Sequence, residues 1–258
     1  MPLPQLDPSA FWGIVGAIVG AVAAIMGGIA GGILSYLLER RRDADAVKKQ
    51  AVAAAMAGES GHFQHVNLRG EDLRGACLKG ADLRYSNLRA TKLVNANLQG
   101  ADLRESDLRG ADLRRADLTL AKLTGAILDS LTQVDSKWRL VWEITSKGAS
   151  KRDLHKSDLQ EAYLGEANLS EANLTDANLR KADLCGAIMQ GADLHRAILS
   201  GAWLSAANFT NADLRGADLE GATVLWKGIN LHGAKYSATT KWPIGFEPPP
   251  DVILVDHD

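Results

Sequence analysis

The chain has 258 residues, a formal net charge of −2 and two cysteines. This length is adequate for one elongated domain with a terminal segment, and the balanced charge identifies no class of ionic partner. With only two cysteines, Cys77 and Cys185, the composition does not indicate a disulfide-rich framework and suits a reducing compartment.

The first predicted element is an apolar helix over residues 11–38. This stretch of 28 residues contains no charged side chain, and as a helix it would extend about 42 Å, more than the ~30 Å hydrocarbon layer of a bilayer. It is too long for the apolar region of a signal peptide, and no basic region precedes it. The sequence therefore predicts an N-terminal tail over 1–10 and one transmembrane helix over 11–38.

Charged residues beside this helix predict its orientation. Only Asp7 precedes it, whereas the following residues include Arg40, Arg41, Arg42, Lys48 and Lys49. The positive-inside rule then places the rest of the chain, beginning with a helical juxtamembrane linker over 39–60, in the cytoplasm. Small residues at four-residue spacing are typical of helix–helix contact or simply of membrane helices; self-association would use Gly16, Gly20, Gly27 and Gly31.

A five-residue repeat occupies most of the remaining chain. Leucine recurs at every fifth position from Leu68 to Leu128, and a second run extends from Leu154 to Val224, one residue out of phase. Neither a helix, with a period of 3.6, nor a strand, with a period of 2, can use this spacing. We therefore expect leucine at position i and the small residue at i−2 to point inward, with polar residues at i−1, i+1 and i+2 outside. Units this short must stack as a solenoid.

The repeated motif is alanine, aspartate or asparagine, leucine, any residue, glycine. Its first three residues occur, for example, at Ala81–Leu83, Ala101–Leu103, Ala172–Leu174 and Ala217–Leu219, the last followed by the glycine. Over about residues 61–236 the chain resembles the pentapeptide-repeat family. The resemblance implies an all-β solenoid, a right-handed quadrilateral β-helix with four pentapeptides per coil. Residues twenty apart would then stack, and the predicted core includes Leu83, Leu108 and one column of Leu169, Met189 and Phe209.

Two arrays, over 61–128 and 154–236, are separated by a tryptophan-containing insert over 129–153. Spacings of three and four residues place Trp138, Val141 and Trp142 on one face of a helix in this insert. Either the helix packs on the side of the rod, or this face is a docking site for a protein partner. The segment resembles an insert of membrane-linked pentapeptide proteins of cyanobacteria, which implies a plasma or thylakoid membrane. Residues 237–258 are expected to cap the open end and to finish as a loose tail over 248–258.

Outward positions of the first array carry a candidate basic stripe. Either aspartates at i−1 offset its charge, or the stripe binds anionic lipid or an acidic protein. Its members are Arg69, Arg84, Arg89, Arg104 and Arg109. The scattered histidines do not have the spacing of a metal site, and no nucleophile–base or phosphate-binding motif occurs. The sequence predicts no cofactor, no metal and no enzymatic activity.

The function that fits these features is a non-enzymatic scaffold for an unknown protein partner, held at the cytoplasmic face of a membrane. One alternative is a nucleic-acid mimic that binds gyrase, as some pentapeptide-repeat proteins do. Such a mimic needs acidic faces, whereas residues 62–130 and 151–226 together carry 18 basic and 20 acidic residues, so nucleic-acid-related partners are not expected. The other alternative is a homo-oligomeric structural protein of the membrane.

Overall fold

A computed structural model describes residues 45–57, 63–223 and 228–257, and the chain divides into two units, Met1–Lys49 and Gln50–Asp258. Residues 45–57 are helical. The predicted transmembrane helix over 11–38 lies outside the described residues, with its four candidate contact glycines, Gly16, Gly20, Gly27 and Gly31. Within 45–57, 63–223 and 228–257, no helix combines the length and apolar character needed to cross a bilayer.

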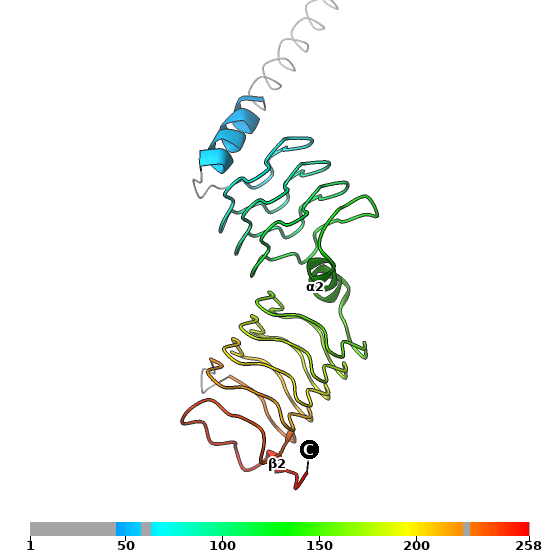
Figure 1. Cartoon of the computed structure of the whole chain (residues 1–258), viewed down its shortest axis with the longest axis vertical. Coiled ribbons are helices and arrows are strands. Elements are labelled where there is room, and N and C mark those ends of the chain that lie inside the picture. The colour runs from blue at the N-terminus through cyan, green and yellow to red at the C-terminus, as the bar shows by residue number, and fades with distance from the viewer. Residues whose placement is uncertain (1–44, 58–62, 224–227, 258) are drawn as a thin grey trace, which may run out of the picture. The chain divides into compact units, whose positions relative to one another are not determined.

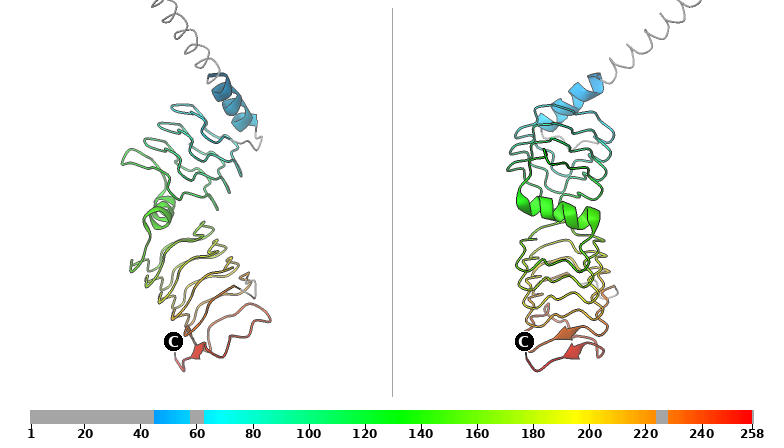
Figure 2. Two further views of the ribbon diagram at one scale, coloured as in Figure 1. Left: turned by 180° about the vertical axis from the view of Figure 1, so that it is seen from behind. Right: turned by 90° about the vertical axis from the view of Figure 1, so that its right-hand side faces the viewer.

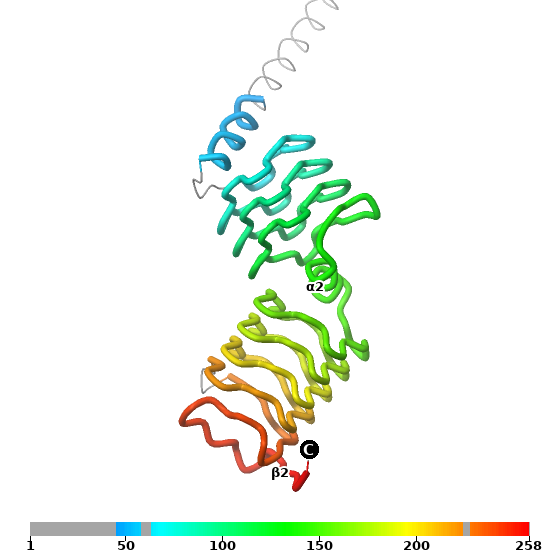
Figure 3. Tube along the Cα trace, viewed as in Figure 1, coloured from blue at the N-terminus to red at the C-terminus, as the bar shows by residue number. Residues whose placement is uncertain are grey.

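The second unit is a β-helix whose coils each take twenty residues (Figures 1 and 3). Parallel bridges join residues twenty apart, such as Asn67 with Asn87 and Asn87 with Asp107. The N–H of most inward leucines donates to a carbonyl of the next coil, as from Leu83 to Asp102 at 2.8 Å. The four pentapeptides per coil that the sequence predicts are therefore confirmed by the register.

Leucines at position i and small residues at i−2 fill the interior. Leu83, Leu108 and Leu169 are fully buried, as are Met189 and Phe209. The N–H of Leu169 donates to the Ile188 carbonyl and that of Met189 to the Asn208 carbonyl, both at 2.8 Å, which places Leu169, Met189 and Phe209 in successive coils of one column. Each buried leucine contributes roughly 1.5–3 kcal/mol, so these columns are the main source of stability.

The aspartate or asparagine at i−1 has a structural role in every coil where it occurs. Its Oδ1 accepts a hydrogen bond from the N–H of residue i+1, at 3.2 Å both from Asn67 to Arg69 and from Asp102 to Arg104. The side chain thus satisfies a backbone donor that the inter-coil hydrogen bonds leave free, as in an Asx turn. The glycine at i+2 has a similar local cause, because Gly70 has a φ of 73°, where residues with a Cβ are strained.

Helix α2 (Ser136–Lys147) lies between the two arrays (Figure 2). It follows the last bridge of the first array, Asp112 with Gln133, and precedes the first bridge of the second, Asp153 with Asn173. The helix ends at Gly148, whose φ is 76° and whose N–H donates to the carbonyl of Ile144. The periodicity that breaks in the sequence over 129–153 is therefore replaced by a helical segment.

Both ends of the β-helix are covered, and the cover of the first end was not indicated by the sequence. At the first end, Ala51 and Ala55 of the helix at 45–57 are buried, and the Ala55 carbonyl accepts the N–H of Cys77 at 3.1 Å. The predicted linker therefore contributes to the core. Its alanines are small enough for the helix backbone to approach the coil closely, and the Ala55 carbonyl accepts a donor that no preceding coil satisfies.

At the other end, the coils continue further than expected. Strand β1 (Lys235–Tyr236) pairs in parallel with β2 (Ile253–Leu254), and Asp218 bridges Lys241. The expectation of a loose tail over 248–258 is thus wrong for its described part, because the Ile253 N–H donates to the Ala234 carbonyl at 2.7 Å. The chain end supplies the pairing that the last coil would otherwise lack.

Candidate interaction surfaces

Helix α2 turns its apolar face toward the repeats. Val141 is fully buried and Trp138 is 8% exposed. The Trp142 indole N–H donates to the Ala126 carbonyl at 2.7 Å. The three candidate docking residues therefore contact other parts of the same chain. This arrangement is the one expected if the helix packs on the side of the rod. A partner of this helix would have to contact its outer side.

Polar contacts connect α2 to both arrays. The Ser146 hydroxyl donates to the Leu123 carbonyl at 3.3 Å on the side of the first array. On the side of the second array, Glu143 pairs with Arg152 at 2.7 Å, and Lys137 Nζ lies 3.4 Å from the Asp158 carboxylate. The helix is thus a structural connector between the arrays.

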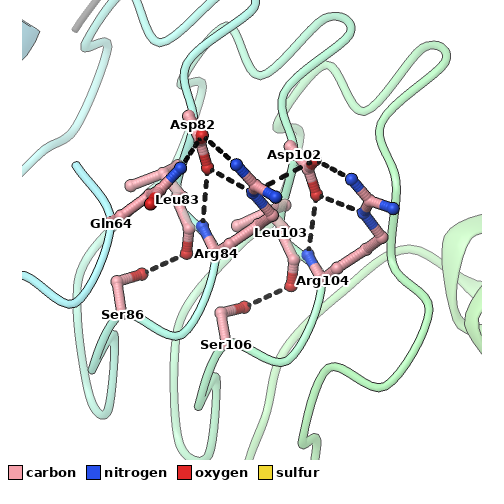
Figure 4. Close-up of polar contacts among 9 residues, drawn as sticks. All are labelled: Gln64, Asp82, Leu83, Arg84, Ser86, Asp102, Leu103, Arg104 and Ser106. Atoms are coloured by element: carbon pink, nitrogen blue, oxygen red, sulfur yellow. Dashed lines mark hydrogen bonds and ion pairs between the residues drawn. The ribbon is translucent and has the colours of Figure 1, made fainter. Parts of the chain in front are cut away.

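Two arginines of the predicted basic stripe form a ladder with aspartates (Figure 4). Arg84 Nε and Nη2 donate to the two Asp82 oxygens at 2.9 and 2.8 Å, and Arg104 binds Asp102 in the same way at 2.9 and 2.6 Å. Arg84 Nε also lies 3.7 Å from Asp102 Oδ2, which links successive coils, and the Gln64 amide donates to Asp82. The charges of this column are neutralised in place, one arginine to each aspartate.

These hydrogen bonds keep the aspartates ionised. The side-chain hydrogen bond from Arg84 holds the pKa of Asp82 far below its usual range. At Asp102, burial raises the pKa, but the hydrogen bonds from Arg104 outweigh that effect and the pKa is lowered overall. The pairs therefore stabilise the folded chain only while the carboxyl groups are charged.

Acid should remove this stabilisation. Because the folded pKa values lie below the value of about 3.9 of an unfolded aspartate, the contribution is complete above pH ~4 and is lost as the pH falls through the folded pKa. We expect the Tm, followed by circular dichroism, to fall steeply below pH ~4. The double variant Asp82→Asn, Asp102→Asn should have a lower Tm at pH 7 and a shallower decline. Parallel curves for the two proteins would contradict the role of the pairs.

The other three arginines of the predicted stripe stack in a different column. The Gly70 N–H donates to the Arg89 carbonyl at 2.9 Å and the Ala90 N–H to the Arg109 carbonyl at 3.0 Å, so Arg69, Arg89 and Arg109 occupy equivalent positions in successive coils. The predicted stripe is therefore two columns, because only residues twenty apart share one. We call the column of Arg69, Arg89 and Arg109 the arginine face.

Sequence reasoning missed the turn that ends the first array. Asp129 Oδ1 accepts the N–H groups of Gly110, at 3.0 Å, and of Leu131 and Thr132, at 3.0 and 2.9 Å. These bonds lower the pKa of Asp129, the largest effect coming from Gly110. The turn presents Leu131, which is 71% exposed, next to the arginine face.

A threonine supports the backbone at this turn. The Thr132 hydroxyl donates to the Leu108 carbonyl at 3.0 Å, and near the end of the second array the Thr240 hydroxyl donates to the Leu214 carbonyl at 2.9 Å. The same bond forms within the first array, from the Thr91 hydroxyl to the Leu68 carbonyl at 2.9 Å. A threonine at this position is therefore not by itself a signal for an array end.

The described surface also has shallow depressions, among them one of about 330 Å³ at the junction of the arrays, lined by Leu120, Glu161, Lys181 and Trp203. Trp203 is 39% exposed there. Over the described ranges, no group of three or more His, Cys, Asp or Glu side chains is placed to hold a metal ion. Many of the charged side chains on this surface, such as Asp82 with Arg84, are instead paired with one another along the columns.

Comparison with known proteins identifies the repeat. Eight copies of the pentapeptide repeat match the chain, over residues 62–93, 91–129, 153–191 and 187–223. Among solved structures, the chain is similar to HetL, a pentapeptide repeat protein involved in heterocyst differentiation regulation from Nostoc sp. strain PCC 7120. The two are 33% identical over 72% of this chain and 80% of that one, with a TM-score of 0.32.

Two further solved structures are similar at lower identity. The pentapeptide repeat protein alr5209 from Nostoc PCC 7120 is 24% identical over 46% of this chain and 93% of that one, with a TM-score of 0.29. QnrB1, a plasmid-mediated fluoroquinolone resistance protein, is 15% identical over 74% of this chain and 92% of that one, with a TM-score of 0.20. A comparison with curated proteins gave no match.

The repeat matches extend on both sides of α2 and cover more than half of the chain. They coincide with the coils in which leucine and alanine point inward and aspartate or asparagine supports the backbone. The chain therefore belongs to the pentapeptide-repeat family, and its repeats form the right-handed quadrilateral β-helix of that family.

Proposed function

We propose that this protein is a non-enzymatic scaffold that binds a protein partner on the outer faces of its coils. The observation that supports this most directly is the column register. Backbone hydrogen bonds such as that from Gly70 to Arg89 set outward side chains one coil apart, at about 4.8 Å. A surface of this kind is ordered before a partner arrives, so little side-chain and backbone entropy is lost on binding.

The family and the polar contacts favour binding over catalysis. Pentapeptide-repeat proteins are generally structural or interaction proteins. In the described part of this chain, the conspicuous charged groups, such as Asp82 with Arg84 and Asp102 with Arg104, are bound to one another. A catalytic side chain must instead be able to reach a substrate, and its pKa must match its role as acid or base.

The proposal includes tethering at the cytoplasmic face of a plasma or thylakoid membrane. Its support is the uncharged segment 11–38 and the basic residues after it, Arg40, Arg41 and Arg42. Self-association through Gly16, Gly20, Gly27 and Gly31 would make the same chain a homo-oligomeric membrane protein, which is the second candidate. Mimicry of nucleic acid receives no support from the first array, where aspartates are paired with arginines.

Cross-linking mass spectrometry on native membranes tests the proposal. The full chain should give cross-links from outward lysines such as Lys92 and Lys181 to a second protein. A variant with Leu108→Asp, which disrupts the β-helix, should lose them. Cross-links only between copies of the chain, through or beside residues 11–38, would favour the homo-oligomer. Complete absence of cross-links to other proteins in membranes where the chain is native would contradict the scaffold.

Sedimentation tests the tether separately. The full chain should sediment with membranes and resist extraction by high salt, whereas a chain that begins at residue 39 should remain in the supernatant. Salt-resistant sedimentation of the shortened chain would contradict a tether that consists of residues 11–38 alone, because the repeats themselves would then bind the membrane.

A further inference from the structure

The arginine face lacks the aspartates that neutralise the other arginine columns. Positions i−1 next to Arg69 and Arg89 hold asparagines, Asn67 and Asn87. Their Oδ1 atoms accept the N–H groups of Arg69 and Arg89 at 3.2 Å, so the asparagines fulfil the structural role of the repeat without supplying a charge. Asn67 and Asn87 therefore support the backbone as an aspartate would, but they supply no negative charge to Arg69 and Arg89.

One carboxylate pairs with two arginines of this column. Asp107 accepts two hydrogen bonds from Arg109, at 2.9 and 2.6 Å, and lies 3.8 Å from Arg89 Nη1. Among the described residues, the Arg69 guanidinium has no ion-pair partner, and Arg69 is exposed. Arg89 and Arg109 therefore share Asp107, and the deficit of negative charge lies at the Arg69 and Arg89 end.

A neighbouring column of the same array provides the contrast. Arg74 binds Asp72 and Arg114 binds Asp112, each with a closest contact of 2.6 Å. Lys92 occupies the i−1 position of the coil between them. Each arginine of that column therefore has its own aspartate two residues before it, so the asparagines beside Arg69 and Arg89 are a local property and do not follow from the repeat.

An aliphatic patch adjoins the far end of this column. Ile127 is 47% exposed, and Leu131 is 71% exposed on the turn that Asp129 organises. Asp129 lies directly after Arg109 in the column, because its carboxylate accepts the Gly110 N–H at 3.0 Å. The face thus runs from the unpaired Arg69 to exposed aliphatic side chains that a hydrogen-bonded turn holds in position.

We propose that the arginine face binds an extended acidic segment of a partner protein. Its carboxylates would pair with Arg69 and Arg89, and its aliphatic residues would pack on Ile127 and Leu131. This inference rests on the proposed scaffold function and names the chemistry of the partner. A protein segment fits better than an anionic membrane, because Asp107 and Asp129 lie in the same face and a uniformly negative surface would meet them as well.

The test adds the missing acids. The double variant Asn67→Asp, Asn87→Asp supplies aspartates that can pair with Arg69 and Arg89, as Asp72 and Asp112 pair elsewhere. The control, Arg74→Gln with Arg114→Gln, changes the net charge by the same −2 on another face. The probe is a fluorescein-labelled peptide of four glutamates followed by two leucines, and its binding to the full chain in non-ionic detergent is measured by anisotropy.

We expect the asparagine-to-aspartate variant to bind the peptide on the order of fivefold to thirtyfold more weakly than the natural chain, the range for losing two exposed ion pairs. The control should bind within about twofold of the natural chain, and Leu131→Ser should also weaken binding, without a change in Tm. The affinity for the natural chain should fall as salt is added.

Equal affinity of the natural chain and the asparagine-to-aspartate variant would overturn the proposal, as would an equal loss in the control. Competition by dihexanoyl-phosphatidylserine that removes the peptide, with the same dependence on Asn67 and Asn87, would replace the protein segment by a lipid headgroup. A partner that cross-links to the chain but is insensitive to these substitutions would leave the scaffold function intact and overturn only this inference.

Discussion

We expect the substitution Leu108→Asp to unfold the β-helix. Leu108 is fully buried in the column of Leu68 and Leu88, and its N–H donates to the Ile127 carbonyl at 2.9 Å. Truncation of a buried leucine to alanine alone costs roughly 2–5 kcal/mol. Aspartate adds an unpaired charge in an apolar interior, where it has no hydrogen-bond donor to compensate for lost water. Circular dichroism should show loss of the β-sheet signal or a greatly reduced Tm.

A second leucine of the same region provides the matched control. Leu131 is 71% exposed, so Leu131→Asp places the new charge in water and should change the Tm little. An unchanged melting curve for Leu108→Asp would contradict the inward orientation of position i. A large loss for Leu131→Asp would instead mean that this side chain is buried in the protein as it exists in solution.

We expect Trp138→Ala to destabilise the protein by roughly 3–5 kcal/mol, the usual cost of removing a large buried aromatic side chain. Trp138 is 8% exposed on the buried side of α2, together with Val141 and Ile144. The free energy of unfolding, measured in urea, should fall. The structure should open first at the junction that α2 forms between the arrays.

The control for this variant is Ser136→Ala at the start of α2. Ser136 is exposed and no side-chain hydrogen bond caps the helix at Asp135, so its loss should change the free energy of unfolding by less than about 0.5 kcal/mol. If Trp138→Ala had equally little effect on stability but removed a cross-linked partner, the side chain would serve docking and not packing.

The repeat was predictable from the sequence because each unit repeats the same local physics. A period of five is incompatible with a helix or a flat strand, so leucine at i and alanine at i−2 had to point inward in a coil, as Leu83 and Ala81 do. The resemblance to pentapeptide repeats added the four-sided coil, and the register of twenty then placed Met189 and Phe209 in one column with Leu169. These are contacts between residues at a fixed spacing, which a sequence records directly.

The candidate surfaces were less predictable, because they depend on which neighbours a side chain reaches across coils. The sequence records that Arg84 and Arg104 follow aspartates whereas Arg69 and Arg89 follow asparagines. Only the coil register shows that Arg84 also lies near Asp102 and that Arg89 reaches Asp107, each in the next coil. The transmembrane helix over 11–38 and its orientation remain predictions from composition.

The sequence by itself determined the coil, its core and the ends of the regular arrays, because periodic burial is written residue by residue. Only the tertiary structure decided that the apolar face of α2 is buried, that Asp129 holds a turn which exposes Leu131, and that β2 returns to pair with β1. All three lie where the period stops. There the energy of a residue depends on partners distant in the sequence, and no repeating neighbour indicates which partner it will meet.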